Sequence, residues 1–304
     1  MRKTLANAVK YRTLYLFLVP ALVTVFFFSY RPMIGLIMAF QEFNMKDGWL
    51  NSPFVGLSNF VNFLRDADFY RALLNTLGLG FLNTIVIFPL PIIFALLLNE
   101  IKFIKFKRVS QTVSYLPHFV SWIIVTSLVT RFLDYRTGML NNLLASFGLE
   151  RIGFMREADY FWTIVIISSI WKGLGWGSII YLSALSGVNQ ELYEAARVDG
   201  AGRWKQTVYV TLPSIMPTIG LMFILSVGGM ISTGGLFDAV YNLSNPMVAS
   251  KAYTLELYVY YQGIIYLRYG YAQAIYLAQS LIALGMVLGA NKIYRRLNDD
   301  ASVF

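Results

Sequence analysis

Few side chains in this 304-residue sequence are of the types that perform covalent chemistry or bind metal ions. There is no cysteine and one histidine, which excludes disulfides, thiolate metal sites and any site that needs two histidines. No G-x-x-x-x-G-K-[ST] segment is present, and the glycines between Gly173 and Gly177 lie in an apolar run without a preceding strand. No Ser, His and Asp arrangement is recognisable. We therefore expect a protein that is not an enzyme and has no cofactor of its own. If it moves a substrate uphill, the energy must come from a partner or an ion gradient.

One lysine lies where a charge is unexpected. Lys172 is near the middle of an apolar segment, where a charged residue costs about 2.5–3.5 kcal/mol on insertion scales. One interpretation is a substrate contact, such as the carboxylate of an acidic sugar, with Trp171 and Trp176 stacking on sugar rings. The alternatives are pairing of Lys172 with a backbone carbonyl or snorkelling, and ordinary packing or an interfacial position for the two tryptophans.

The longest candidate interaction surface is a polar stretch between two apolar segments, Asn189 to Pro213. Asn189 is a favourable N-cap and Glu191 lies in the first turn, so Gln190–Val198 is predicted to be a short helix. The adjacent Ala195 and Ala196 give this helix a small face that a partner can approach closely.

The second half of the polar stretch also has local signals. Asp199-Gly200 predicts a turn, because glycine accepts the left-handed conformation that ends a helix. A second short helix is predicted over residues 202–209, with Trp204 and Tyr209 as aromatic anchors. Leu212-Pro213 is expected to begin the next apolar helix, since proline is tolerated in a first turn.

The composition requires that these residues be positioned by membrane helices. The sequence is 57% hydrophobic and 13% charged, with a mean hydropathy of +0.57, whereas soluble domains have about 25% charged residues. We expect an all-α polytopic membrane protein with one transmembrane domain over residues 1–304. Six spans are expected at about 14–40, 73–98, 113–132, 161–185, 214–237 and 271–293. The apolar run inside the tyrosine-rich connector over 238–270 is too short to cross the membrane, so we expect a re-entrant or interfacial helix there.

The distribution of charge predicts the orientation. The two termini, the connector after the second span and the polar stretch together hold 14 Lys and Arg and 6 acids, whereas the three opposite connectors with their flanks hold 10 of each. Basic residues near the ends of spans favour the cytoplasmic side. Both termini and the stretch 189–213 are therefore predicted to be cytoplasmic, in a multi-pass protein of the bacterial plasma (inner) membrane.

The polar stretch resembles the EAA loop of MetI-like permease subunits of type I ABC importers. The resemblance is carried by Glu194-Ala195-Ala196, Asp199-Gly200-Ala201 and Leu212-Pro213, with Val210 and Thr207 as mild departures. Further segments resemble the branch that imports oligosaccharides and polysaccharide fragments: Pro32–Gly35, Ala95–Glu100, Ser114–Phe119 and Trp171–Gly173.

The resemblance implies a fold, a function and partners. It implies a six-span permease that works with a second permease subunit, two ABC ATPase subunits that bind the ATP, and an extracytoplasmic sugar-binding protein. The expected substrate is an oligosaccharide, membrane lipid surrounds the spans, and no nucleic acid is expected as a partner. It implies that the loop docks on an ATPase, and the residues assigned to this contact are Glu191, Glu194, Ala195, Ala196, Asp199, Gly200, Ala201, Trp204, Leu212 and Pro213.

The substrate path is the less determined part. Ser226 and Gly229 belong to a Gly- and Ser-rich fifth span that either lines a cavity or packs closely against other helices, and the resemblance favours the cavity. With Lys172, Trp171 and Trp176 they form the predicted path, and the lysine suggests an acidic, uronate-containing sugar.

Two other classes of protein are alternatives. An ion-coupled secondary transporter needs ion-coupling groups at the membrane midplane, and no Asp or Glu lies inside the predicted spans. An intramembrane enzyme acting on glycan or lipid needs a cluster of acids or histidines at one face, and the acids of the outer connectors are scattered.

Overall fold

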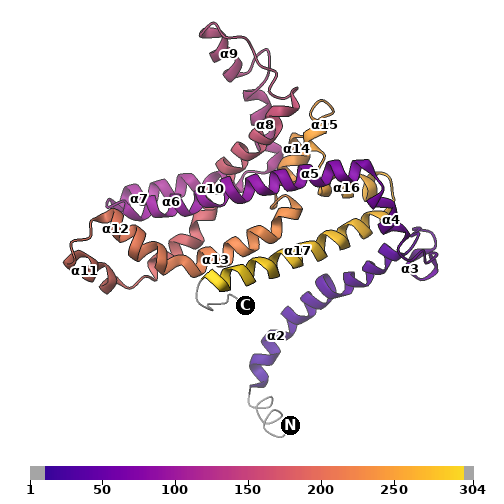
Figure 1. The fold of residues 1–304 in the computed structure, drawn as a ribbon, viewed down its shortest axis with the longest axis horizontal. Helices are drawn as coiled ribbons and strands as arrows, with labels where there is room; N and C mark the ends of the chain where they lie inside the picture. The colour runs from indigo at the N-terminus through magenta and orange to yellow at the C-terminus, as the bar shows by residue number, and fades with distance from the viewer. Residues whose placement is uncertain (1–10, 298–304) are drawn as a thin grey trace. The chain divides into compact units, whose positions relative to one another are not determined.

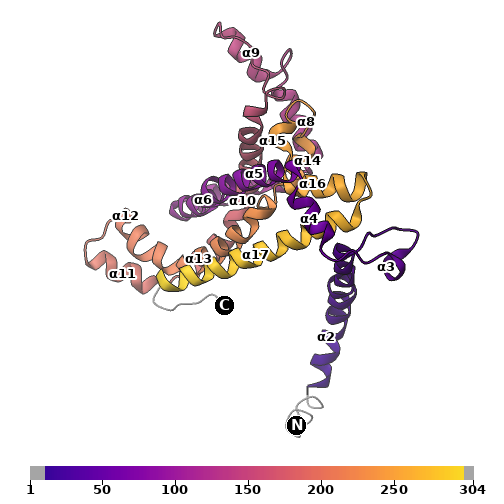
Figure 2. The same ribbon diagram turned by 45° about the vertical axis from the view of Figure 1, so that its right-hand side comes forward.

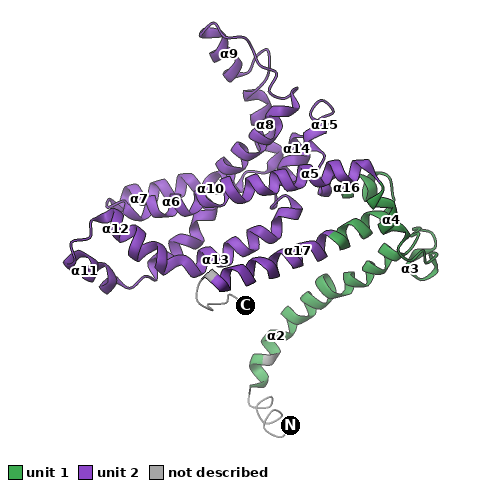
Figure 3. Ribbon diagram, in the orientation of Figure 1, with its two compact units in different colours: residues 1–65, 259–278 green, residues 66–258, 279–304 purple. Residues whose placement is uncertain are grey.

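The computed structural model describes residues 11–297, and the backbone of this part is helical with no β-strand beyond an isolated Gln41–Phe54 bridge. The chain divides into two compact units, residues 1–65 with 259–278 and residues 66–258 with 279–304 (Figure 3). The basic residues Arg2, Lys3 and Lys10, which contribute to the predicted orientation, lie outside the described residues.

The first unit contains one long helix and several short ones. Its first 29 helical residues, Arg12–Phe40, comprise α2 (Arg12–Val25), the π-helical η1 (Phe26–Tyr30) and the 3-10 helix η2 (Arg31–Phe40). The other elements are α3 (Gly48–Asn51), α4 (Ser58–Leu64), η8 (Tyr261–Ile265) and the first residues of α17 (Tyr269–Leu297).

The second unit contains most of the helical bundle. Its first half consists of α5 (Ala67–Leu82), η3 (Asn83–Ile87), α6 (Pro89–Glu100), α7 (Ile104–Tyr115), η4 (Leu116–Phe119), α8 (Trp122–Phe132), α9 (Met139–Ser146), η5 (Ala158–Tyr160) and α10 (Phe161–Ser186). Its second half consists of α11 (Gln190–Val198), α12 (Arg203–Gln206), η6 (Thr207–Thr211), α13 (Leu212–Gly229), η7 (Met230–Ser232), α14 (Phe237–Leu243), α15 (Ala249–Ala252), most of α16 (Leu255–Tyr260) and the rest of α17.

By length and composition, five helices of the described chain can cross a membrane. They are Arg12–Phe40, Ala67–Glu100, Ala158–Ser186, Arg203–Leu243 and Tyr269–Arg296, each corresponding to a predicted span. The third predicted span, 113–132, is different: Ile104–Phe119 and Trp122–Phe132 form a pair bent by 97°. The helix ends at Val120, which is extended, and Ser121 caps the next helix through its side chain.

Three prolines follow π-helical turns. Pro32, Pro89 and Pro213 each lie two residues after such a turn, in η1, η3 and η6. In each turn the amide before the proline donates to the carbonyl five residues back: Arg31 to Phe26, Phe88 to Asn83 and Leu212 to Thr207. Because proline has no N–H and its ring crowds the carbonyl four residues back, widening the turn lets the helix continue.

The second unit buries an apolar cluster between α6, α10 and α13. Ile92, Tyr181, Leu185 and Ile215 are members of this cluster, and each is at most 8% exposed. In Figures 1 and 2, α11 and α12 lie at one end of this unit and α14 and α15 lie at the other. Within this unit the predicted cytoplasmic loop is thus well separated from α14 and α15 of the predicted outer connector over 238–270, which also forms α16 and η8.

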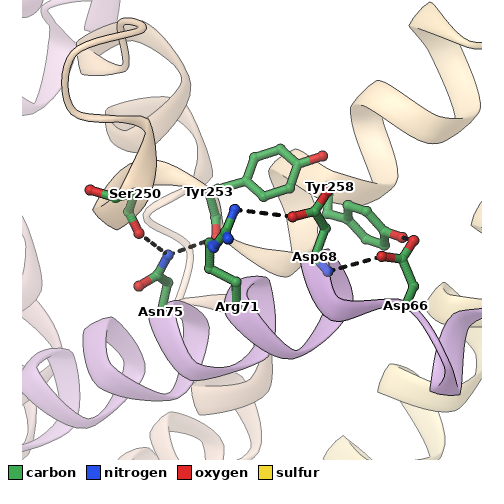
Figure 4. A network of polar contacts seen from close by, with 7 residues as sticks. All are labelled: Asp66, Asp68, Arg71, Asn75, Ser250, Tyr253 and Tyr258. Carbon is green, nitrogen blue, oxygen red and sulfur yellow. Dashed lines mark hydrogen bonds and ion pairs between the residues drawn. The ribbon is translucent and has the colours of Figure 1, made fainter.

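A polar network fixes the start of α5 to the predicted outer connector (Figure 4). Asp66 caps α5 by accepting from the backbone N–H of Asp68 at 2.9 Å, and it accepts the hydroxyl of the fully buried Tyr258 at 2.5 Å. About two turns further on, Asn75 donates to the carbonyls of Ser250 and Tyr253 at 2.9 and 3.0 Å. The connector therefore has a defined position on α5, whose continuation in η3 contributes Asn83 to the cavity described below.

Candidate coupling segment and translocation cavity

The first half of the segment Asn189–Pro213, called here the coupling segment, confirms the predicted helix. α11 covers Gln190–Val198, and the Asn189 side chain accepts from the backbone N–H of Glu191 at 3.0 Å. Gly200 has φ +76°, and the amide of Ala201 donates to the carbonyl of Ala196 at 2.8 Å. This is the glycine-terminated helix end predicted from Asp199-Gly200.

The second half of the coupling segment differs from the prediction. α12 continues through η6 into α13, so the fifth membrane helix begins at Arg203 rather than at Leu212-Pro213. Pro213 still occupies the first turn of α13, but the wide turn of η6 makes its missing N–H compatible with a continuous helix. The coupling segment is therefore one short helix joined by a tight turn to the end of a long one.

Several large apolar side chains of the coupling segment face solvent. Val198, Trp204 and Tyr209 are 88%, 79% and 75% exposed. Glu194 is exposed as well, and its carboxylate lies 3.9 Å from the guanidinium of Arg197. Exposed aliphatic and aromatic side chains among charged ones are typical of a protein–protein contact surface.

Residues that the sequence analysis did not select fix this segment to the bundle. The hydroxyls of Tyr193 and Thr211 lie 2.9 Å apart, and Tyr193 packs against the apolar cluster of α6, α10 and α13. Gln206 donates to the carbonyl of Ala201 at 2.7 Å, across the turn. Helical spacing is the sequence signal for Tyr193, because residues 193 and 196 lie on the same side of α11. Its partner Thr211 is 18 residues away in the sequence, so no local pattern indicates this contact.

A cavity of about 490 Å³ lies between η3, α6, α10 and α13. Ser226 and Gly229 of α13, both predicted path residues, line it together with Asn83 of η3 and Gly173 of α10. The Ser226 hydroxyl lies 3.2 Å from that of Thr84. The volume of the cavity is within the range of small-molecule sites, about 300–1,000 Å³.

The other predicted path residues are not among those lining this cavity. Lys172 donates from Nζ to the carbonyls of Pro117, His118 and Val120, at 3.4, 2.6 and 2.5 Å. This is the carbonyl pairing given above as an alternative, and it satisfies backbone groups freed by the 97° bend.

The two tryptophans next to Lys172 have separate environments. Trp176 stacks on His118 with a centroid distance of 4.3 Å and an interplanar angle of 2°. Trp171 is 49% exposed. The structure thus brings Ser226 and Gly229 together at the cavity and groups Lys172 and Trp176 at the bend of the third span.

A left-handed turn borders the cavity at the end of α13. Thr233, Gly234 and Gly235 have φ values of 51°, 67° and 82°, and Gly234 lines the cavity. A Cβ on Gly234 would lie 1.9 Å from Nδ2 of Asn83, so both the conformation and the space require glycine. The Thr233 hydroxyl donates to the Glu256 carboxylate at 2.6 Å, which ties the turn to the predicted outer connector.

The carboxyl of Glu256 has a raised pKa. Burial is the main cause, the nearby Asp238 carboxylate adds to it, and the hydrogen bond from Thr233 acts in the opposite direction. The carboxyl that accepts from Thr233 thus binds its proton more tightly than an exposed glutamate does.

The sequence of residues 2–300 matches the family described as binding-protein-dependent transport system inner membrane component. Protein LplB of Bacillus subtilis (strain 168) is 41% identical over 94% of this chain and 90% of its own length. The polygalacturonan/rhamnogalacturonan transport system permease protein YteP of the same organism is 36% identical over 98% of this chain and 92% of its own.

Two solved structures have the same fold. A chain of a bacterial ABC transporter involved in the import of the acidic polysaccharide alginate has a TM-score of 0.88 and 37% identity, covering 97% of this chain and 99% of its own. A chain of the bacterial alginate ABC transporter in complex with an alginate pentasaccharide-bound periplasmic protein has a TM-score of 0.87 and 36% identity, with 98% of each chain covered.

Replacing Lys172 tests its structural role. Lys172→Met removes a cation from three carbonyls, and a hydrogen bond to a charged group contributes about 1.5–3 kcal/mol. We expect a lower thermal unfolding midpoint in detergent, and equal fractional losses of uptake for acidic and neutral oligosaccharides. Lys172→Arg, which keeps N–H donors, is the control. Unchanged stability with a selective loss of acidic sugar uptake would instead assign Lys172 to the substrate.

The raised pKa of Glu256 predicts a pH dependence of stability. The folded state binds this proton more tightly than the unfolded state, so the contribution to stability is full below the ordinary pKa and is lost as pH rises through the folded pKa. In Glu256→Gln, which keeps a neutral acceptor for Thr233, this dependence is absent. Thermal unfolding is measured at pH 4.5 and at pH 8, and the unfolding midpoint of Glu256→Gln relative to that of the wild type should be higher at pH 8. An equal difference between the two midpoints at both pH values would contradict the raised pKa of Glu256.

Proposed function

We propose an acidic oligosaccharide as the cargo of this chain, which belongs to the family of binding-protein-dependent transport system inner membrane components and is a membrane-spanning permease subunit of an ABC importer. The proposal includes uronate-containing fragments delivered by an extracytoplasmic binding protein. It is supported by relatives whose names specify polygalacturonan/rhamnogalacturonan and alginate.

The observation that carries the coupling mechanism is the continuity of α12, η6 and α13. The exposed end of this helix carries Trp204, and the same helix contributes Ser226 and Gly229 to the cavity wall. A force applied at the coupling segment therefore reaches the cavity through an unbroken helix, without a flexible joint. Tyr193 and Thr211 add a second attachment, from α11 to the same helix.

We infer that the coupling segment is the docking site for an ABC ATPase on the cytoplasmic side. Glu191, Glu194 and Asp199 supply charge at the exposed end of unit two, and Leu192, Val198 and Trp204 supply apolar contact. Closure of two ATPases would move this segment and rock the helices around the cavity. ATP is bound by the ATPases, and a second permease completes the path.

The charge pattern supports the orientation of the chain in the membrane. With the coupling segment in the cytoplasm, the connectors on the opposite side hold as many acids as bases, and the cytoplasmic side holds the excess of Lys and Arg. Both termini are then cytoplasmic. The outer connector with α14, α15 and α16 faces the binding protein.

The lining of the cavity is compatible with passage of a sugar chain. Asn83 and Ser226 supply hydrogen-bonding groups, Phe88 and Tyr181 supply aromatic surface, and the described residues that line it include no charged side chain. An acidic sugar would find no cation there that holds it tightly. The support for an acidic cargo therefore comes from the relatives and not from Lys172.

Two glycines of the coupling segment form a matched pair for testing the mechanism. A Cβ on Gly200 or Gly202 meets no atom within 4 Å, but Gly200 has φ +76° and Gly202 has φ −69°. Gly200→Val forces a left-handed valine, at a cost of at least about 1–2 kcal/mol, and should lower uptake and transport-coupled ATP hydrolysis about tenfold or more. Gly202→Val should transport normally.

The measurement is uptake of labelled oligogalacturonate by cells that express the complete importer, with membrane levels of each variant determined by immunoblot. Glu194→Lys should also abolish uptake while insertion stays intact, because it reverses a charge on the docking face. Full uptake by both Gly200→Val and Glu194→Lys would contradict the proposed role of the coupling segment.

A second glycine pair tests the cavity as the substrate path. Gly173 lines the cavity and Gly285 of α17 does not, and a Cβ at either meets nothing within 4 Å. Gly173→Leu should fill part of the cavity and lower uptake severalfold, with longer oligosaccharides affected more than short ones. Gly285→Leu should leave uptake unchanged. Equal uptake by the two variants would place the path elsewhere.

A further inference from the structure

The first unit contains a second cavity, of about 430 Å³, with a different lining. It lies between the segment that follows the first span and the residues that start α17. Its polar lining combines the three amides of Gln41, Asn59 and Asn62 with the carboxylate of Glu42 and the guanidinium of Arg268. Such a set offers donors and acceptors in nearly equal measure, unlike the largely apolar lining of the translocation cavity.

Gln41 is a buried and fixed member of the lining. Gln41 is 5% exposed, and its Nε2 donates to the carbonyl of Trp49 at 2.9 Å. Its Oε1 is buried and accepts no hydrogen bond from the described residues. Gln41 is thus held in one orientation by the Trp49 carbonyl, while its Oε1 has almost no surface open to the cavity.

The cavity is held in shape by its own backbone contacts. Asn59 donates from Nδ2 to the carbonyls of Ala39 and Gln41, both at 3.0 Å. Gly270 packs so closely that an added Cβ would lie 2.3 Å from the carbonyl oxygen of Gln41. The polar groups are therefore arranged before any ligand arrives.

Arg268 and an aromatic wall complete the site. Leu267, at φ 57°, turns the chain so that the Arg268 guanidinium lies 4.1 Å from the centroid of the Tyr271 ring and donates to Gln262 Oε1 at 3.0 Å. Tyr269 lines the cavity and packs edge-on against Phe43, with centroids 5.7 Å apart. A ring that is held in this way gives a flat apolar surface beside hydrogen-bonding groups.

We propose that this cavity binds sugar units of the incoming oligosaccharide on the extracytoplasmic side of the membrane. Sugar hydroxyls both donate and accept, which matches the amides of Asn59 and Asn62. An apolar sugar face packs on Tyr269, and a uronate carboxylate pairs with Arg268. The side of the membrane rests on the proposed function. If the N-terminus is cytoplasmic, as proposed, the far end of the first span, where this cavity lies, is extracytoplasmic.

The test is direct binding to the complete importer in nanodiscs, without its binding protein. The probes are tetragalacturonate and the neutral arabinotetraose, titrated by calorimetry. Asn62→Ala and Arg268→Gln change exposed side chains of the site and should weaken tetragalacturonate binding about tenfold, and Arg268→Gln should affect arabinotetraose less. Asn51→Ala and Arg65→Gln are matched controls on exposed residues of the same unit that do not line the cavity.

The outcomes separate this proposal from the proposed function. Gly200→Val should block uptake and leave tetragalacturonate binding unchanged. Wild-type uptake of oligogalacturonate by Asn62→Ala and Arg268→Gln, with no saccharide binding in nanodiscs, would overturn the sugar site while the importer function stands. Variants that weaken capture of the binding protein but not of either saccharide would also overturn it. A third result is that the wild type binds arabinotetraose but not tetragalacturonate, and that Asn62→Ala loses this binding. It would support a sugar site and contradict an acidic cargo.

Discussion

Backbone hydrogen bonding in an apolar environment is the constraint on which the structure depends. In lipid a freed carbonyl or amide has no water to pair with, so each interruption of a helix needs a substitute. At the bend of the third span the substitute is Nζ of Lys172, which reaches three carbonyls. After η7 it is Gln279, which donates to the carbonyl of Ile231 at 2.7 Å. Lys172 and Gln279 are thus explained by the places where helices are interrupted.

The same constraint decides which interruptions transmit motion. A proline that follows a π-helical turn changes the helix without ending it, and this is how α12 becomes continuous with α13 past Pro213. The turn at Thr233–Gly235, by contrast, ends the helix and is fixed from outside by Glu256 and Asn83. Movement at the coupling segment would therefore carry α13 as a body as far as this turn, where the cavity border begins.

Local sequence signals predict local structure, but they do not predict contacts between residues that are far apart in the sequence. Asn189 and Gly200 gave the correct bounds of α11, because a cap and a left-handed glycine act within a few residues. Hydropathy located five spans, and the pairing of Lys172 with a backbone carbonyl was foreseen as a possibility. Which carbonyls it would reach depends on a bend some fifty residues earlier in the chain, so no pattern around Lys172 could specify them.

The two cavities differ in a way that transport itself explains. A site that first receives a sugar gains from polar groups fixed in advance, and Gln41, Asn59 and Arg268 are fixed by hydrogen bonds to their surroundings. A site through which the sugar must then move cannot hold it as strongly, because tight binding in the path slows release as much as it favours entry. The described lining of the translocation cavity, with Ser226 and Asn83 among apolar side chains and no charged group, meets this second requirement. The larger share of polar and charged groups therefore belongs at the entrance and not along the path.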